Sequence, residues 1–600
     1  MSQLEDSKTF GFIAQLLLLA LGFVLPFEVP LFSLGPLVIT LPELFLYLLC
    51  AIWVAALWYQ ALFLPGTLAR ARTTLGEIAG TPLPRAVVLW MAVTILSAVV
   101  ASSHRLPALK FAFRTLSGVL LYFAARDLTR SSSMARRLVM AIVAGAVLSA
   151  SSTFLEVLRP EWSSWWQPFR GQQFSVSGVL RASGTFAFPN IAAMYWEATL
   201  PLLLLVPSWE NPEMGRPERL RFAFRCLLAA VLIHAILASA TRASIYGAAF
   251  VAILLLVLAR VARSSQRRPP NAAVSRFAFA ILLTEVLLAA MVLWQGGATS
   301  IMAQRLFWWR EGDWYRARYI AEGMAPSKMS AGSTEDFRIQ VQNVGRATWH
   351  SDRAPRVELG YRWEREGSTT SRDDTLEGRR TPLSQDVVPQ GVTTIAVPLA
   401  VPARPGTYLL RWDLVVDDGD RFSNLGTPSA VQRIVVEPSI ETIAGSRPEL
   451  VGGASHVPLP SRSQLWVAAL RLWRKHTLLG VGPDNFRHRY GEAISPGRGS
   501  RYTDERLHAN NLYLEVLADL GLTGAAALLI LIYALAVQAR RAISTAGLLD
   551  PLVVFALLAT ITFFVHGLVD YFFEFTPTLD LWWLLLALAG RDPQRPLPSQ

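Results

Sequence analysis

The feature that most constrains this chain is a series of apolar runs that recur along its length. A helical run of about 20 apolar residues spans the hydrocarbon core of a bilayer, where only helices and closed barrels satisfy their backbone polar groups. The sequence therefore predicts an all-α polytopic membrane protein with about twelve transmembrane helices. The expected spans are 10–26, 43–64, 84–101, 107–125, 138–157, 186–207, 222–240, 243–260, 277–295, 512–537, 550–569 and 577–590.

Arginine is distributed unevenly among the loops between these runs. Clusters occupy every second loop, whereas the loop at 27–42 contains neither Lys nor Arg. Because basic residues accumulate on the cytoplasmic side of a membrane, we expect both termini to be cytoplasmic and segment 295–511 to lie outside. The net charge of +12 is accounted for by anionic lipids, so no nucleic-acid partner is expected. The clusters contain Arg70, Arg72, Arg85, Arg126, Arg130, Arg136, Arg137, Arg216, Arg219, Arg221, Arg225, Arg260, Arg263, Arg267, Arg268, Arg540 and Arg541.

Segment 326–438 differs in pattern from the rest of the chain. Stretches such as DFRIQVQNVG, TTIAVPLAV and GTYLLRWDLVV alternate apolar and polar residues and are separated by Gly, Pro, Asn and Asp. This period of two, broken by turn residues, predicts an inserted extracytoplasmic β-sandwich. The phrases QNVGRATW and PARPGTYLLRWDLV resemble immunoglobulin-like modules of bacterial surface proteins. A spacer or docking role is favoured over glycan binding.

The two flanks of this module are aromatic and basic. Trp308, Trp309, Trp314, Trp466 and Trp473 suit helices at the level of the lipid headgroups, either as plain anchors or as part of a substrate-binding surface. The predicted division is N-terminal transmembrane helices at 1–295, an interfacial segment at 296–325, the β-sandwich at 326–438, interfacial helices at 439–511 and C-terminal transmembrane helices at 512–590.

A polar stretch directly precedes the predicted span at 512–537. His508, Asn510 and Asn511 lie immediately before the apolar run. Polar groups at the mouth of a membrane span are costly unless they have a function. An imidazole has an ordinary pKa of ~6.5, which suits a base near neutral pH. His508 is therefore the candidate catalytic residue, and a helix cap or an interfacial residue is the alternative.

The first turns of the same span contain two acidic residues and two glycines. Glu515 and Asp519 are one helical turn apart, so they are expected to share a face. Gly521 and Gly524 are spaced for a close contact with another helix. The sequence therefore predicts a functional helix end rather than a plain membrane anchor.

Two arginines occur in short polar turns that the charge distribution places on the outer side. Arg181 begins RASGTFAFPN, and Arg242 lies in SATRASIYG between two predicted spans. Either arginine alone could extend to the headgroups. Together with His508 they suit a diphosphate, because each guanidinium offers a planar fork of donors. The sequence contains no His-Glu-X-X-His motif, and its two cysteines have no metal-ligand spacing, so no metal and no other cofactor is expected.

Four stretches in this order resemble the O-antigen ligase and polymerase superfamily: RASGTFAFPNIAAMY, SATRASIYG, RSQLW…GVGPDNFRHRY and LHANNLYLEVLADLGLTG. HGLVDYFFEF (566–575) resembles the closing segment of that superfamily. The resemblance implies a helical bundle in which Arg181 and Arg242 engage a lipid-linked diphosphate and His508 acts on the acceptor. Arg487 and Arg489 are secondary phosphate candidates, Asp570 and Glu574 are secondary base candidates, and Asn511 is a further candidate. The inserted module departs from the family pattern and leaves the acceptor open.

The expected function is transfer of a preassembled glycan from undecaprenyl diphosphate to an acceptor hydroxyl on the outer face of a bacterial cytoplasmic membrane. The acceptor is a lipid core for a ligase, another lipid-linked glycan for a polymerase, or a protein for an O-oligosaccharyltransferase. Membrane lipids are the remaining partner. The alternative from another class is a flippase of lipid-linked sugar, which would place charges deep in the bilayer. Lys110, Arg114, Glu197 and Glu285 are the few candidates for such charges.

Overall fold

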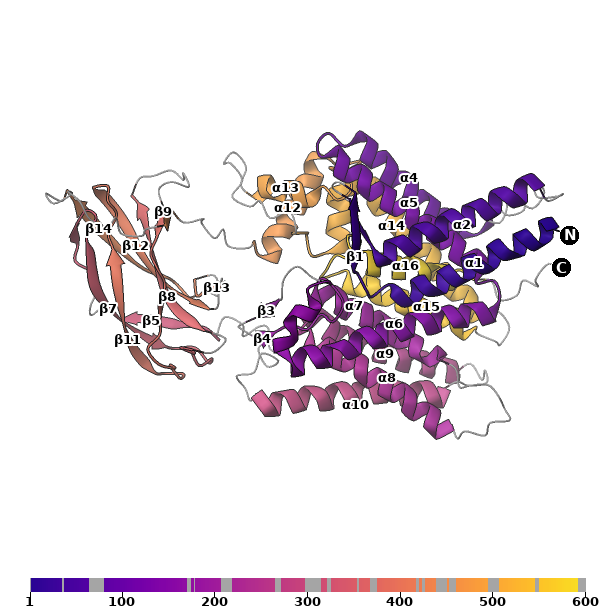
Figure 1. Cartoon of the computed structure of the whole chain (residues 1–600), viewed down its shortest axis with the longest axis horizontal. Helices are drawn as coiled ribbons and strands as arrows, with labels where there is room; N and C mark the ends of the chain where they lie inside the picture. The colour runs from indigo at the N-terminus through magenta and orange to yellow at the C-terminus, as the bar shows by residue number, and fades with distance from the viewer. Residues whose placement is uncertain are drawn as a thin grey trace. The chain divides into compact units, whose positions relative to one another are not determined.

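The computed structural model describes residues 2–34, 37–63, 80–169, 174–176, 179–206, 218–264, 271–296, 314–320, 325–352, 356–366, 375–416, 420–423, 427–438, 451–452, 460–494, 507–544 and 550–591. The chain forms two compact units. The first comprises residues 1–174, 182–289 and 460–600, and the second comprises 175–181 and 290–459. Figure 1 shows that the first unit is built of helices and that strands dominate the second.

The helices follow the apolar runs of the sequence. They are α1 (Ser2–Val24), α2 (Leu41–Phe63), α4 (Pro82–Val100), α5 (Arg105–Leu128), α6 (Ser132–Leu158), α7 (Pro189–Thr199), α8 (Glu218–Ala238), α9 (Arg242–Ser264), α10 (Asn271–Gly296), α12 (Arg462–Lys475), α13 (Phe486–Ile494), α14 (Leu512–Ser544), α15 (Pro551–His566) and α16 (Thr576–Ala589). The chain also forms two 3₁₀ helices, η1 (Pro160–Trp166) and η2 (Leu200–Leu205). It has two short antiparallel strand pairs, β1 (Pro30–Leu34) with β2 (Leu37–Thr40) and β3 (Ser175–Val176) with β4 (Val179–Leu180).

Within the described residues, eight helices are long and apolar enough to cross a membrane: α2, α4, α5, α6, α8, α9, α10 and α14. Three of the other predicted spans correspond to shorter apolar helices, in α1, α15 and α16. The predicted span at 186–207 instead forms the 11-residue α7 followed by η2, where Pro201 removes a backbone donor. The chain is thus a mostly helical polytopic membrane protein, and its described residues contain eight helices long enough to span a membrane, where the sequence predicted about twelve.

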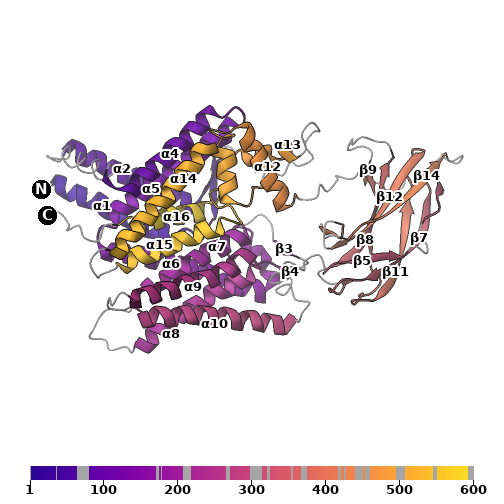
Figure 2. The same ribbon diagram turned by 180° about the vertical axis from the view of Figure 1, so that it is seen from behind.

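Helix α16 lies at the centre of the helical unit. Every one of its residues is buried, and it packs against α15, α5, α7 and α2; Figure 2 shows it from the opposite side. Gly118 of α5 allows this packing, because a Cβ at that position would collide with the indole of Trp583. The loop between α15 and α16 is therefore fixed at the end of the most buried helix.

Helix α14 is interrupted at Gly521, whose φ of 62° and ψ of −157° are not helical. Segment 477–482 enters the interruption and satisfies the backbone groups that the break releases. The four hydrogen bonds run from Val481 N to Ala518 O (3.0 Å), Gly482 N to Asp519 O (2.9 Å), Leu522 N to Thr477 O (2.9 Å) and Thr523 N to Leu478 O (3.1 Å). The predicted helix contact at Gly521 and Gly524 is therefore wrong. A Cβ at Gly521 would meet the backbone of this segment, and one at Gly524 would meet Leu520 of the same helix.

The second unit is built around two sheets. One has the order β11 (Val392–Ala400), β7 (Thr334–Asn343), β5 (Ala317–Ile320). The other has the order β15 (Val451–Gly452), β9 (Thr375–Glu377), β8 (Val357–Arg365), β12 (Gly406–Val416), β14 (Ala430–Glu437), β6 (Lys328–Ser330), with β10 (Thr381–Pro382) on β8 and β13 (Asp420–Arg421) on β12. Alternate residues of β11 are buried, as the period of two predicts.

Both sheets contribute to one hydrophobic core, which includes Trp349, Trp363 and Trp412. Tyr408, near the start of β12, donates from its hydroxyl to Arg404 O at 2.9 Å, a corner typical of immunoglobulin-like domains. Trp314 belongs to this core and is 4% exposed. Its predicted position at the headgroup level is therefore wrong, because the strand that follows it, β5, pairs with β7. Trp308 and Trp309 lie outside the described residues.

Candidate active site

The turn that carries His508 is fastened to the loop between α15 and α16. Asn511 accepts a hydrogen bond from Leu514 N (3.0 Å) and donates to Leu568 O (2.7 Å), while Leu512 N donates to Gly567 O (2.7 Å). An Asn at this position caps the first turn of α14. The predicted candidate Asn511 thus orients the turn.

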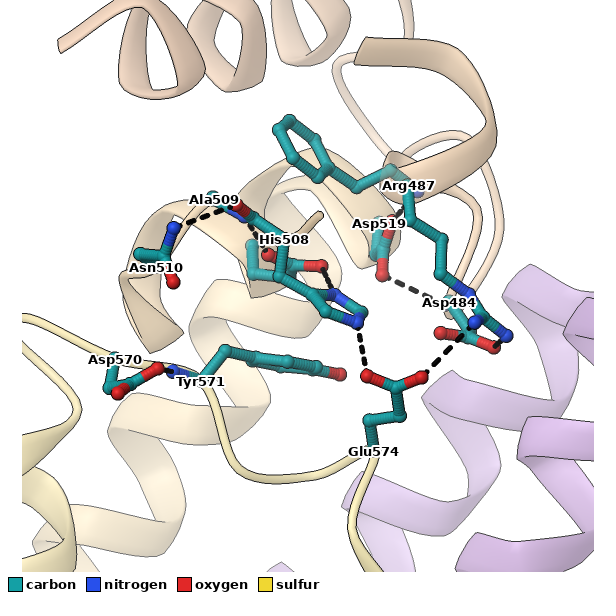
Figure 3. A network of polar contacts seen from close by, with 11 residues as sticks. Asp484, Arg487, His508, Ala509, Asn510, Asp519, Asp570, Tyr571 and Glu574 are labelled. Carbon is teal, nitrogen blue, oxygen red and sulfur yellow. Dashed lines mark hydrogen bonds and ion pairs between the residues drawn. The ribbon is translucent and has the colours of Figure 1, made fainter. Parts of the chain in front are cut away.

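The imidazole of His508 is held on three sides (Figure 3). Its Nδ1 lies 2.5 Å from Glu515 Oε1, and its Nε2 lies 2.5 Å from Glu574 Oε2. The ring stacks on Tyr571, with 4.8 Å between the centroids. The second oxygen of Glu515 accepts a hydrogen bond from Ala509 N. His508 therefore has a fixed ring orientation and a carboxylate at each nitrogen.

The two carboxylates determine the charge of this histidine. Burial lowers the pKa of His508, but Glu515 and Glu574 raise it more, and the net pKa lies well above the ordinary value. Burial raises the pKa of Glu574, but His508 and Arg487 leave it below the ordinary value. Hydrogen bonding to a charged form favours that form. At neutral pH the pair is an imidazolium and a carboxylate.

Arg487 extends the network away from His508. It donates from Nη1 to Glu574 Oε1 (3.1 Å) and from Nη2 to Asp484 Oδ2 (2.7 Å). Asp519 accepts from the backbone N–H groups of Asp484 and Phe486, both at 2.8 Å. Glu515 and Asp519, which were predicted to share a face of the helix, thus have separate roles. Glu515 fixes the turn that carries His508. Asp519 fixes the turn before Arg487.

The GVGPDN motif (480–485) has the conformation that this turn requires. Gly480 and Gly482 have φ values of 68° and 106°, which side chains beyond glycine rarely adopt. A Cβ at Gly480 would also collide with the backbone of Asp519. Asn485 donates from Nδ2 to Ser103 O and Val481 O, both at 3.0 Å. The motif is therefore needed to place Arg487 beside Glu574.

Residues 429–529 match a protein-family model described as O-Antigen ligase. The matched segment contains Asp484, Arg487, His508, Glu515 and the interruption of α14. The resemblance to the O-antigen ligase superfamily is confirmed. The family indicates a glycosyltransferase-like ligase or polymerase whose partners are a lipid-linked glycan and an acceptor.

The other comparisons add no argument. No curated protein matches this chain. Among solved structures, the chain is similar to one described as Pseudomonas fluorescens alkylpurine DNA glycosylase AlkC bound to DNA containing an abasic site analog, at 10% identity. The similarity covers 59% of this chain and 97% of that one, with a TM-score of 0.15. A value this low supports neither a common fold nor a common function.

The structure separates the predicted O-antigen ligase-type site residues into groups. His508, Asn511, Arg487 and Glu574 lie in or beside one network, as described above. Arg489 is elsewhere: its Nη1 lies 3.2 Å from His476 Nε2 and its Nε lies 3.9 Å from Glu492.

Asp570 adjoins a second buried cluster. Its carboxylate accepts a hydrogen bond from Tyr571 N (2.9 Å) and lies 4.0 Å from His566 Nε2. His566 Nδ1 lies 2.9 Å from Glu197 Oε2 and 3.5 Å from Ser244 Oγ. Gly247 leaves room for the Glu197 carboxylate, which a Cβ would strike. This cluster joins α7, α9 and α15.

The two predicted diphosphate-binding arginines lie at the ends of elements. Arg242 is the first residue of α9 and is half-buried. Arg181 follows β4 and is half-buried, in the second unit. The next residue, Ala182, donates from its N–H to Ala238 O at 3.0 Å, four residues before Arg242. The chain after Arg181 is thus tied to the turn before α9.

Sequence patterns did not identify Tyr571 or Asp484, and they gave Glu515 no histidine partner. Glu574 is 66 residues from His508, and no local period reports such a contact. The available sequence signal for this contact was that the segment HGLVDYFFEF contains two acidic residues, Asp570 and Glu574. Within the described ranges, no three His, Cys, Asp or Glu side chains are grouped so that they could hold a metal ion.

Proposed function

We propose that this protein transfers a preassembled glycan from undecaprenyl diphosphate to an acceptor hydroxyl on the outer face of the bacterial cytoplasmic membrane. The observation that carries the proposal is the buried His508 between Glu515 and Glu574, which lies within the segment matched to the O-antigen ligase family. An acid–base group with a fixed orientation is what proton removal from a hydroxyl requires.

His508 and the carboxylate of Glu574 together form the proposed centre of acid–base catalysis. The acceptor hydroxyl attacks the anomeric carbon directly, so the configuration inverts, and the diphosphate leaves. Because the Nε2 proton of His508 faces Glu574 Oε2, the pair acts as one unit. Glu515 holds the imidazolium by its other nitrogen, as a buried carboxylate does in catalytic triads.

Arg242 and Arg181 are the proposed ligands of the diphosphate. A guanidinium offers two parallel donors to phosphate oxygens and stabilises the charge that develops on the leaving group. Arg487 already serves two carboxylates, and Arg489 adjoins His476, so these two rank below Arg242 and Arg181.

The inserted module is proposed to be an extracytoplasmic β-sandwich within the outer segment 295–511. Its role is that of a spacer or docking domain. Sugar-binding surfaces commonly rely on exposed aromatic rings, which have an apolar body and a polar handle. In the described part of the module, Trp349, Trp363 and Trp412 are all buried in the core.

The reaction is tested by incubating the purified protein with undecaprenyl-diphosphate glycan and each of three acceptors: a lipid core, a second lipid-linked glycan and a protein. Release of free undecaprenyl diphosphate with growth of one acceptor supports the proposal and identifies a ligase, a polymerase or an O-oligosaccharyltransferase. A donor that remains intact and changes only its leaflet would establish the flippase instead.

A further inference from the structure

The histidine at the centre of the site is less accessible than one of its partners. The side chain of His508 is 6% exposed and that of Glu515 is 0% exposed, whereas that of Glu574 is 22% exposed. Tyr571 covers one face of the imidazole. A hydroxyl that approaches this network from solvent therefore meets Glu574 before it meets His508.

Glu574 also has more free hydrogen-bonding capacity than His508. Both nitrogens of His508 face carboxylate oxygens at 2.5 Å, which leaves no nitrogen for an acceptor. A carboxylate has about four lone-pair sites. Glu574 uses one on Oε2 for His508 and one on Oε1 for Arg487. The remaining sites allow Glu574 to accept a hydrogen bond from a substrate hydroxyl.

We propose that Glu574 is the catalytic residue that takes the proton from the acceptor hydroxyl, with His508 as the buried partner that positions it. This inference rests on the proposed glycan transfer and refines its proton path. Inverting glycosidases likewise use a carboxylate as general base, which there activates the attacking water.

The chemical step balances with the groups present. The acceptor O–H proton moves to an oxygen of Glu574 as the acceptor oxygen bonds to the anomeric carbon. The bond between that carbon and the phosphate oxygen breaks, and its electron pair leaves with the diphosphate. Glu574 then loses the proton to water. His508 and Arg487 contact the two oxygens of Glu574 and favour its carboxylate form.

The main test is the near-isosteric variant Glu574→Gln, which keeps the shape and removes the base. Transfer is measured under single-turnover conditions at saturating undecaprenyl-diphosphate glycan, and donor binding is measured separately. Loss of general base catalysis is expected to lower the rate by about 10²–10⁴-fold with donor affinity unchanged. The matched control is Glu492→Gln on α13, because the side chain of Glu492 is 67% exposed. A Glu574→Gln protein within a few-fold of the wild-type rate overturns the inference.

The pH dependence separates a base from a merely structural carboxylate. Among the described residues, the titratable and charged groups around Glu574 and His508 are Glu515, Tyr571, Arg487, Asp484, Arg114 and Glu28. Because the pKa of Glu574 lies below its ordinary value, the wild-type rate is expected to fall only at pH values below the ordinary pKa of a glutamate. Glu574→Asp should keep this acidic limb at a reduced rate, and the residual activity of Glu574→Gln should lack it.

The outcomes separate this inference from the function on which it rests. If the wild type releases undecaprenyl diphosphate and Glu574→Gln does so at a similar rate with the acidic limb intact, Glu574 is not the base and the function stands. If the wild type releases none with any acceptor, the function itself fails.

Discussion

The helical unit contains two buried histidines that each contact a glutamate, and they differ in their surroundings. His508 contacts carboxylates at both nitrogens, and one of these, Glu574, is 22% exposed and shared with Arg487. His566 contacts Glu197 through Nδ1, and both side chains are at most 1% exposed. Within the described residues, His566 Nε2 has no hydrogen-bond partner. A histidine–carboxylate contact alone therefore does not mark chemistry; access from solvent and a carboxylate within hydrogen-bond distance of each ring nitrogen do.

The two clusters are expected to have different roles. The His508 network lies on a helix start and two loops, and its Glu574 is partly exposed. The His566 cluster connects α7, α9 and α15 and holds the helix that begins with Arg242. We expect substitutions in the first cluster to affect turnover and those in the second to affect stability.

The largest effect is expected for His508→Ala. The variant should insert and bind undecaprenyl-diphosphate glycan, but its transfer rate should fall by about 10²–10⁴-fold, because the acid–base pair is lost. Single-turnover transfer and donor binding are the measurements. His476→Ala and His488→Ala are matched controls on the segment between α10 and α14 and should change the rate much less. Near wild-type transfer by a correctly inserted His508→Ala protein would remove the distinction between the two clusters.

A smaller effect, on stability, is expected for His566→Ala. Removing one member of a buried ion pair leaves a buried charge and costs about 3–5 kcal/mol, so the variant should melt at a lower temperature in detergent. At temperatures well below melting, the rate per folded molecule should fall less than for His508→Ala. The double variant Glu197→Gln/His566→Asn, which removes both charges, should recover part of the stability. If His566→Ala melts like the wild type yet loses transfer, the second cluster also takes part in the reaction.

The smallest effect is expected for Arg242→Lys and Arg181→Lys. Each keeps the charge but loses the planar fork. Donor binding should weaken by about tenfold, which corresponds to one charge-assisted hydrogen bond of about 1.5 kcal/mol. Arg260→Lys, at the exposed opposite end of α9, is the control. Unchanged donor binding in both variants would show that these arginines contact only lipid headgroups. The His566 cluster would then not position a diphosphate-binding residue.

The sequence predicts some of this arrangement because the relevant patterns are local. Apolar length placed most helices, and one helical turn between Glu515 and Asp519 placed both on one face. Contacts between distant segments were not predictable, such as that of Glu574 with His508. Gly521 was assigned to a helix contact because a glycine in an apolar run is compatible with both a close contact and an interruption. Only the partner segment 477–482 decides between them.

The interruption of α14 has a consequence for biogenesis. Alone in a bilayer, this helix would leave the carbonyls of Ala518 and Asp519 and the N–H of Leu522 without the partners that segment 477–482 supplies, and lipid offers no substitute. The helix therefore becomes a stable span only after that segment has docked on it. The ribosome synthesises this segment before α14 and Glu574 after it. The contact between His508 and Glu574 consequently forms late, after α15 has been synthesised, so nascent chains lack this contact while the earlier helices are still assembling.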